Sequence, residues 1–169
     1  MIKDAAARAR FASGPTTNIA RVGLGVAVRS GAPKPDISTP DALKQTLLKA
    51  QSIATIPASA TGTQVLRVFD TLGISETMKA KTKAQPTPAQ VVQAVASGEV
   101  ELGVFLLNVL TAPGLDVVGP FPAAVQQEVV FTAAVAANAK EVDAGKAFIK
   151  FLTTPVAAAL IRAKGMNPG

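Results

Sequence analysis

The 169-residue chain contains no cysteine, histidine, tryptophan or tyrosine. Without cysteine it can form no disulfide, thiolate metal site or cysteine nucleophile. Without histidine it lacks the commonest general base and metal ligand, which excludes a serine–histidine triad and a histidine zinc site. We therefore expect no metal, no cofactor and no catalytic residue in this chain.

Aromatic residues are also scarce, at 4%, and the net charge is +6, from 17 Lys and Arg against 11 Asp and Glu. A basic surface attracts anions, but scattered basic residues with few aromatics disfavour specific nucleic-acid binding. No apolar run reaches the roughly 20 residues of a membrane span, so we expect no membrane insertion. The N-terminal sequence MIKDAAARARFASG has no apolar core of a signal peptide, so the chain as written predicts a cytoplasmic location.

Blocks of helix-forming and β-branched residues alternate along the chain and are separated by many of its 13 glycines and 12 prolines. This alternation is typical of an α/β protein with a largely parallel sheet. The pairs Thr39-Pro40, Thr87-Pro88 and Thr154-Pro155 predict helix starts, with threonine as the N-cap and proline at the first helical position. Residues 79–85, in which lysines alternate with small residues, predict an exposed edge strand.

The stretch from Gln51 to Leu72 predicts a buried strand, a turn and an amphipathic helix. The strand is the β-branched run from Ser52 to Ile56, and Pro57 ends it because proline cannot donate to a sheet. The helix carries its apolar residues on one stripe: Val65, Leu66, Val68, Phe69 and Leu72.

The turn before this helix consists of small and hydroxylated residues, namely Ser59, Ala60, Thr61, Gly62 and Thr63. A helix N-terminus has open backbone N–H groups, and hydroxyls add further donors, so such a turn suits an anion. The same residues are typical of a simple helix cap by Ser59 or Thr61, and the turn taken alone favours capping.

Asn108 is a second candidate, because it is the one polar side chain in the long apolar stretch that follows the predicted strand Glu101–Leu107. Ligands of open α/β sheets lie beyond the carboxyl ends of the strands, where an asparagine amide can bind them. A role as a turn residue is equally consistent with the sequence.

Several segments, in this order, resemble the molybdate-type branch of the periplasmic solute-binding proteins, the type II fold that serves ABC importers. The segments are RVGLGVAVRSGAPKPDISTPDALK from Arg21, the strand-turn-helix at Ser52–Phe69, GEVELGV from Gly98, LDVVGPFP from Leu115, and AFIKFLTTPVAAAL from Ala147. Together they cover roughly residues 19–169, and their number and order make chance similarity an unsatisfactory explanation.

The resemblance implies two α/β lobes joined by crossing strands, with an anion held by helix N-termini and hydroxyls of both lobes. Residues 29–128 would form the complete second lobe, and residues 1–28 and 129–169 a remnant of the first lobe with the hinge strands. The family's anion turn falls on Ser59–Thr63 and its pocket wall on Phe105–Asn108. The turn is therefore now better explained as a binding site than as a cap alone.

The resemblance further implies a small anionic solute, an oxyanion or a carboxylate, as the ligand. It also implies an ABC transporter permease as the partner and a periplasmic location. Full family members begin with a signal peptide and roughly eighty further residues that carry the rest of the first lobe. We therefore expect a truncated first lobe and weak binding.

Two other functions stay open at this point. One is an isomerase resembling aconitate isomerase, which is similar to this family and moves a proton on a tricarboxylate; here its base would have to be a carboxylate or a lysine. The other is a ligand-sensing or interaction module, because effector domains of transcription regulators share the type II fold.

The C-terminal helices predict self-association. Their apolar residues, Phe148, Ile149, Leu152, Leu160 and Ile161, would lack the first-lobe sheet that covers them in the family. The strand Val22–Val28 would also present an unpaired edge. We therefore expect a homo-oligomer, most simply a two-fold dimer.

Overall fold

The computed structural model describes residues 10–11 and 16–169. It divides into two compact units, which we describe separately: a larger unit, Val22–Val129, and a smaller unit that joins the described residues up to Arg21 with Val130–Gly169. The strands β1 and β6 run from one unit into the other. The assignment of residues 29–128 to a complete lobe, and of the rest to a lobe remnant, stays a prediction.

The larger unit is built on a sheet with the strand order β3-β2-β4-β1-β5, which is mixed and not largely parallel as the sequence predicts. These strands are β1 (Thr17–Arg29), β2 (Ile53–Thr55), β3 (Thr82–Ala84), β4 (Leu102–Leu106) and β5 (Leu115–Pro120). The strand β2 pairs in parallel with both β3 and β4, whereas β1 runs antiparallel to β4 and, across a bulge at Val26 and Ala27, to β5. The expected unpaired edge at Val22–Val28 is wrong, because Gly25 to Ala27 have strand neighbours on both sides.

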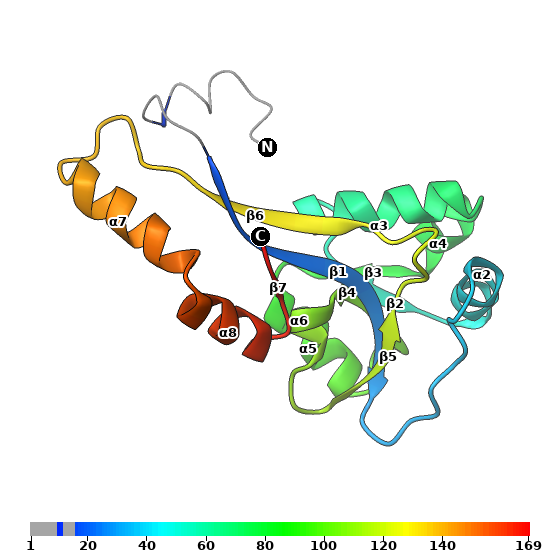
Figure 1. Ribbon diagram of the computed structural model, residues 1–169. Helices are drawn as coiled ribbons and strands as arrows, with labels where there is room; N and C mark the ends of the chain where they lie inside the picture. Colours follow the sequence, from blue (N-terminus) through cyan, green and yellow to red (C-terminus); the bar gives the residue numbers. More distant parts are fainter. Residues whose placement is uncertain (1–9, 12–15) are drawn as a thin grey trace. The chain divides into compact units, whose positions relative to one another are not determined.

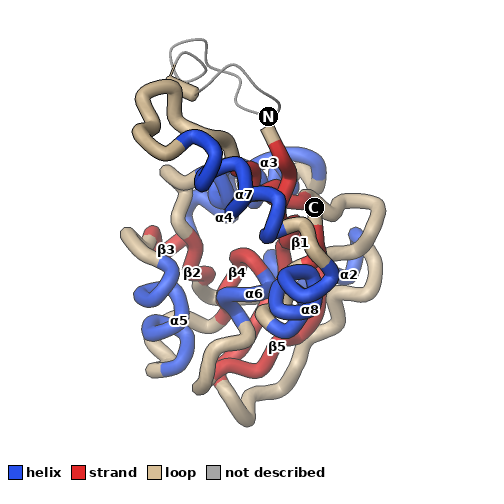
Figure 2. The backbone as a smooth tube through the Cα atoms, turned by 60° about the vertical axis from the view of Figure 1, so that its left-hand side comes forward, coloured by secondary structure: helices blue, strands red, loops and turns tan. Residues whose placement is uncertain are grey.

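Helices cover both faces of this sheet, as expected for the α/β class. The helices of the larger unit are α2 (Pro40–Lys49), α3 (Ala60–Thr71), α4 (Ser75–Lys81), α5 (Pro88–Ala96) and α6 (Leu107–Leu110). Figure 1 shows α3 and α4 on one side of the sheet and α5 and α6 on the other, and Figure 2 traces the same strands and helices from a second direction. The apolar stripe of α3 is inward, since Val65, Val68 and Phe69 are almost completely buried.

Threonine caps and N1 prolines begin three helices, which confirms the helix starts expected from the sequence. The side chains of Thr39, Thr87 and Thr154 accept hydrogen bonds from the backbone N–H three residues later. These bonds satisfy donors that a helix N-terminus otherwise leaves open, and the prolines have no N–H at the position where it would be unpaired.

Residues 79–85 do not form the expected strand throughout. Helix α4 continues to Lys81, and only Thr82–Ala84 forms the edge strand β3. The ammonium group of Lys81 donates to the carbonyls of Leu48 and Ala50, 2.5 and 2.7 Å away, at the C-terminal end of α2. These two hydrogen bonds to α2 hold Lys81 at the end of α4. The alternation of lysines with small residues does not reveal them.

The smaller unit contains β6 (Glu128–Ala133) from Val130 on, together with β7 (Asn167–Pro168), α7 (Val142–Leu152) and α8 (Pro155–Ala163). The strand β7 pairs with β1 at Ala20 and Arg21. Helix α7 buries no residue, and α8 buries only Ala157 and Ile161. Among the described residues no single helix is long and apolar enough to cross a membrane. Helices α7 and α8 taken together have that length and apolarity, but a bend of 64° separates them.

The N-terminus of α3 lies against the end of β2 at unusually short range. A Cβ atom added to Gly62 would lie 1.9 Å from the carbonyl oxygen of Ile56 and 2.7 Å from the Cα of Pro57. Only glycine can occupy this position without moving the backbone. Gly62 therefore fixes where the first turn of α3 lies relative to the strand that precedes it.

We predict that Gly62→Ala lowers the free energy of unfolding by about 2–4 kcal/mol, because a backbone carbonyl cannot yield to the added methyl group as a side chain would. Thr63→Ala, at the exposed neighbouring position, is the matched control and should change stability by less than about 1 kcal/mol. Urea unfolding followed by circular dichroism measures both. Equal stability of the two variants would contradict the close approach.

The side chain of Gln126 completes the pairing of β1 where β5 has ended. Its Oε1 accepts from the N–H groups of Leu24 (2.8 Å) and Gln127 (3.0 Å), and its Nε2 donates to the carbonyls of Leu24 (3.0 Å) and Phe121 (3.3 Å). Gly23 leaves room for this amide, since a Cβ there would lie 3.1 Å from Nε2. All the hydrogen-bonding groups of one amide are thus used to hold β1.

We predict that Gln126→Leu destabilises the protein by about 2–4 kcal/mol, because it removes four hydrogen bonds and leaves the N–H of Gln127 and the carbonyl of Phe121 without a partner among the described residues. Gln93→Leu on the exposed side of α5 makes the same chemical change where no such network exists, and should stay within about 0.5 kcal/mol of the parent. Thermal unfolding of the three proteins in parallel tests this, and a neutral Gln126→Leu would show that the network adds nothing.

Candidate functional site

The candidate site lies at the edge of the sheet where the parallel strands end. Strands β2 and β4 are neighbours, and their carboxyl ends lead into α3 and α6. The turn Ser59–Thr63 and Asn108 therefore belong to the same edge of the larger unit. This is where open α/β sheets bind ligands.

Ser59 and Thr63 use their hydrogen-bonding groups within the turn. The Ser59 hydroxyl accepts from the N–H of Gly62 (2.9 Å) and donates to the carbonyl of Ile56 (2.8 Å), while its own N–H donates to the same carbonyl (3.0 Å). The N–H and hydroxyl of Thr63 both donate to the carbonyl of Ser59, at 2.9 and 3.1 Å. The capping role expected for Ser59 is thus present.

Ala60 and Thr61 differ from their neighbours because no hydrogen bond among the described residues uses their backbone N–H groups. Thr61 is only 6% exposed, and its hydroxyl also has no partner among these residues. The first turn of α3 carries no acidic residue, so the partial positive charge of the helix N-terminus is not neutralised there. The turn thus contains a cap and, beside it, free donors.

Asn108 lies in the four-residue helix α6 rather than in an extended strand exit. Its Oδ1 is buried and has no hydrogen-bond partner within the described part of the chain. The fully buried hydroxyl of Thr55, the last residue of β2, is in the same condition. Buried polar atoms without partners are rare, and they call for a water molecule or a ligand.

Thr55 is the residue of this edge that sequence reasoning missed. Its hydroxyl stands at the end of the apolar strand Ile53–Thr55, next to the turn. A β-branched threonine is ordinary in a strand, so its presence alone signals nothing. Only burial of the hydroxyl without a partner distinguishes it.

Shifted carboxyl pKa values occur elsewhere in the larger unit. A hydrogen bond from the backbone N–H of Ser38 lowers the pKa of Asp36. The backbone N–H of Gly31 and the hydroxyl of Ser30 lower the pKa of Asp116. These hydrogen bonds hold the carboxylates of Asp36 and Asp116 in surface turns, and neither turn is the Ser59–Thr63 turn. Within the described part of the chain, no group of three acidic side chains is placed to hold a metal ion.

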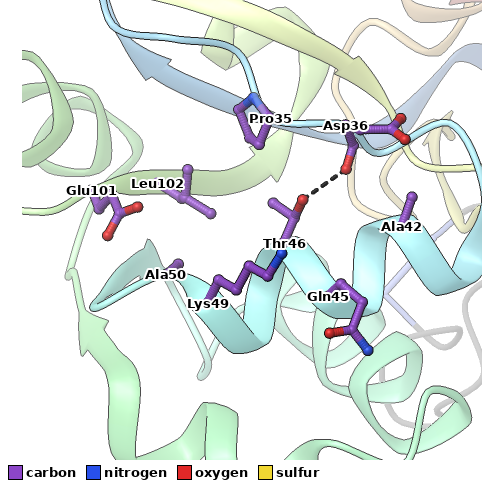
Figure 3. Close-up of a pocket in the computed structure, with 9 residues that line it drawn as sticks. All are labelled: Pro35, Asp36, Ala42, Gln45, Thr46, Lys49, Ala50, Glu101 and Leu102. Atoms are coloured by element: carbon purple, nitrogen blue, oxygen red, sulfur yellow. Dashed lines mark hydrogen bonds between the residues drawn. The ribbon is translucent and has the colours of Figure 1, made fainter.

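A depression of about 420 Å³ lies on the opposite side of the same unit, where β4 begins (Figure 3). Two of its polar groups are engaged within the protein: the Thr46 hydroxyl donates to the Asp36 carbonyl (2.7 Å), and the Glu101 carboxylate accepts from the N–H of Gln51 (2.7 Å). It lies at the amino end of β4, away from the carboxyl edge. We therefore place the candidate site at the turn.

Three comparisons with known proteins bear on this geometry. Aconitate isomerase from Pseudomonas sp is 40% identical over 165 residues, which cover 93% of this chain and 62% of that protein. A Clostridium difficile structure described as the substrate binding domain of a molybdenum ABC transporter superposes with a TM-score of 0.73 at 16% identity, over 97% of this chain and 71% of that one. The periplasmic molybdate-binding protein of Azotobacter vinelandii superposes with a TM-score of 0.70 at 21% identity, over 96% and 72%.

The two superpositions establish the fold, which is that of the periplasmic binding proteins expected from the sequence. The chain spans about three fifths of the length of the aconitate isomerase that it matches. The sequence profile of the bacterial extracellular solute-binding proteins matches residues 1–167, nearly the whole chain. This chain therefore belongs to the family of bacterial extracellular solute-binding proteins.

Proposed function

We propose that this protein binds a small anionic solute, an oxyanion or a carboxylate, at the N-terminus of α3. The observation that carries the proposal is the pair of unused backbone N–H groups of Ala60 and Thr61, in a first turn that contains no acidic residue. Two adjacent N–H groups at the positive end of a helix form a charge-assisted site for an anion. The Thr61 hydroxyl adds a third donor.

The other four predicted residues support this site in different ways. Ser59 and Thr63 fasten the turn, and Gly62 allows it to lie against β2. Asn108 lies at the same sheet edge, and its buried Oδ1 has no partner among the described residues. This oxygen can accept a hydrogen bond from a hydroxyl group of the ligand or from a water molecule bound with it. The net charge of +6 favours the approach of anions over long range.

Membership of the family supports two further proposals. The bound solute is delivered to the permease of an ABC transporter, and the protein works outside the cytoplasmic membrane, in the periplasm. The similar proteins support two chemical classes of ligand for this site. The 40% identity with aconitate isomerase supports a carboxylate, and the fold shared with a molybdate-binding protein supports a tetrahedral oxyanion.

We predict that Ala60→Pro weakens anion binding about tenfold or more, because it removes one charge-assisted hydrogen bond. Proline is tolerated at this position: α2, α5 and α8 begin with one. The ψ angle of 164° at Ser59 is also compatible with a following proline. Ala60→Gly keeps the N–H and is the matched control.

Isothermal titration with molybdate, tungstate, sulfate and trans-aconitate measures these affinities. The expected result is binding of at least one anion by the parent and by Ala60→Gly, with a marked loss in Ala60→Pro. If none of the four anions binds, or if Ala60→Pro binds as the parent does, the proposed site is wrong.

A second candidate function is isomerisation of a tricarboxylate, which the 40% identity with aconitate isomerase favours. The reaction moves a proton and so needs a general base close to the bound substrate. Residues 58–63 contain no ionisable side chain. The turn can thus hold a carboxylate of the substrate but supplies no base.

We therefore predict that the protein binds aconitate without converting it. The ultraviolet absorbance of cis-aconitate, followed at high protein concentration, should not drift toward that of the trans isomer. Sustained conversion that scales with protein concentration would establish the isomerase and would direct the search for the base to carboxylates and lysines outside the turn.

A further inference from the structure

The edge of the sheet where β2 and β4 end holds two buried side-chain atoms without a hydrogen bond. They are the hydroxyl oxygen of Thr55 and the Oδ1 of Asn108, and within the described part of the chain no other buried side-chain nitrogen or oxygen lacks a partner. The same edge carries the unused N–H groups of Ala60 and Thr61. An unpaired buried polar atom is costly, so their concentration at one edge points to a ligand there.

The pairing of β2 with β4 brings Asn108 and the start of α3 to neighbouring points of this edge. Ala54 of β2 lies beside Gly103 of β4 in the parallel pair. Five residues after Ala54 comes Ser59, the cap of α3, and five residues after Gly103 comes Asn108. The two segments therefore leave the sheet side by side.

Thr55 contributes from the face of the sheet that α3 covers. A Cβ atom added to Gly103 would lie 3.1 Å from Leu110 of α6 and 3.3 Å from Val95 of α5. Ala54, beside Gly103, shares that face. Thr55 is the next residue and points to the opposite face, on which α3 lies (Figure 1). It is 0% exposed, so its hydroxyl is enclosed at the end of β2 that leads into the turn.

The amide of Asn108 is partly buried and is not held by the protein. No hydrogen bond between described residues engages either end of this amide, whereas its backbone carbonyl accepts from the hydroxyl of Thr111 (3.0 Å). The last torsion of an asparagine side chain is broad, so rotation about it can direct Oδ1 toward a ligand at the edge. This oxygen can only accept, so its partner must carry a hydrogen.

A hydroxyl group is the donor that suits this oxygen. Ionised oxyanions such as sulfate and molybdate, and carboxylates without another functional group, present acceptors only and leave Oδ1 unpaired. An ammonium group would need a negative partner when it is buried. Neither residues 58–63 nor α6 contains an acidic side chain.

We propose that the solute is a hydroxycarboxylate, whose carboxylate is bound by the N–H groups of Ala60 and Thr61 and whose hydroxyl donates to Oδ1 of Asn108. The inference rests on the proposed function and adds the class of ligand to it. The hydroxyl of Thr55 can both donate and accept, so it does not distinguish a hydroxycarboxylate from the carboxylate that lacks the hydroxyl.

Isothermal titration with two pairs of carboxylates tests this: each enantiomer of malate against succinate, and citrate against tricarballylate. The members of each pair differ by one hydroxyl group. We expect the parent to bind the hydroxylated member of at least one pair about tenfold more tightly or better, because the other member leaves a buried acceptor unpaired. Asn108→Leu, similar in shape but without the acceptor, should lose this preference. Thr55→Val removes the other unpartnered oxygen and is the matched control, which should keep it.

Circular dichroism verifies that each variant is folded, and Asn108→Ala replaces Asn108→Leu if the latter is not. A preference that the Asn108 variant retains, or that Thr55→Val abolishes as well, would overturn the role of Asn108. Equal binding of both members of each pair, with a loss in Ala60→Pro, would overturn the hydroxycarboxylate and leave the anion site standing. If the parent binds none of these carboxylates, the inference fails, and the titrations with inorganic oxyanions test the anion site separately.

Discussion

The close contact between Gly62 and the carbonyl of Ile56 is the constraint on which the candidate site depends. It holds the first turn of α3 against the end of β2, and the same carbonyl then accepts hydrogen bonds from the N–H and hydroxyl of Ser59. Because these contacts are internal, the N–H groups of Ala60 and Thr61 are the ones in this turn that no other described residue uses. Fixed donors need no reorganisation when an anion binds, which favours affinity.

Among the described helices, the four that begin with a side-chain cap fall into two kinds. Helices α2, α5 and α8 begin with threonine and proline, a cap that satisfies one donor and a residue that has none. Helix α3 begins with Ser59 and Ala60, which retains a donor at the first position. A threonine–proline start leaves few backbone N–H groups at the helix N-terminus for an anion. The serine–alanine start leaves two N–H groups open at the positive end of the helix.

The sequence predicted the α/β class, the threonine caps and the organisation of residues 51–72, because these depend on local spacing and cap chemistry. It could not predict that Lys81 would extend α4 by bonding to the end of α2, or that Asn108 would lie in a helical turn, since both depend on distant packing. For the site, it identified the turn but not the division between Ser59, which is engaged, and Thr61, which is not. That division depends on which hydroxyl the folded turn brings to the N–H of Gly62, and the sequence offered both Ser59 and Thr61 as the cap.

The claim that the anion is held by two particular backbone groups can be measured directly. In a titration of the ¹⁵N-labelled protein with the tightest-binding anion, the amide resonances of Ala60 and Thr61 should shift furthest and saturate together. Those of Gly62 and Thr63, whose N–H groups are already bonded to Ser59, should shift much less. Shifts that are largest among the lysines of residues 79–83, with Ala60 and Thr61 unmoved, would contradict this account of the site.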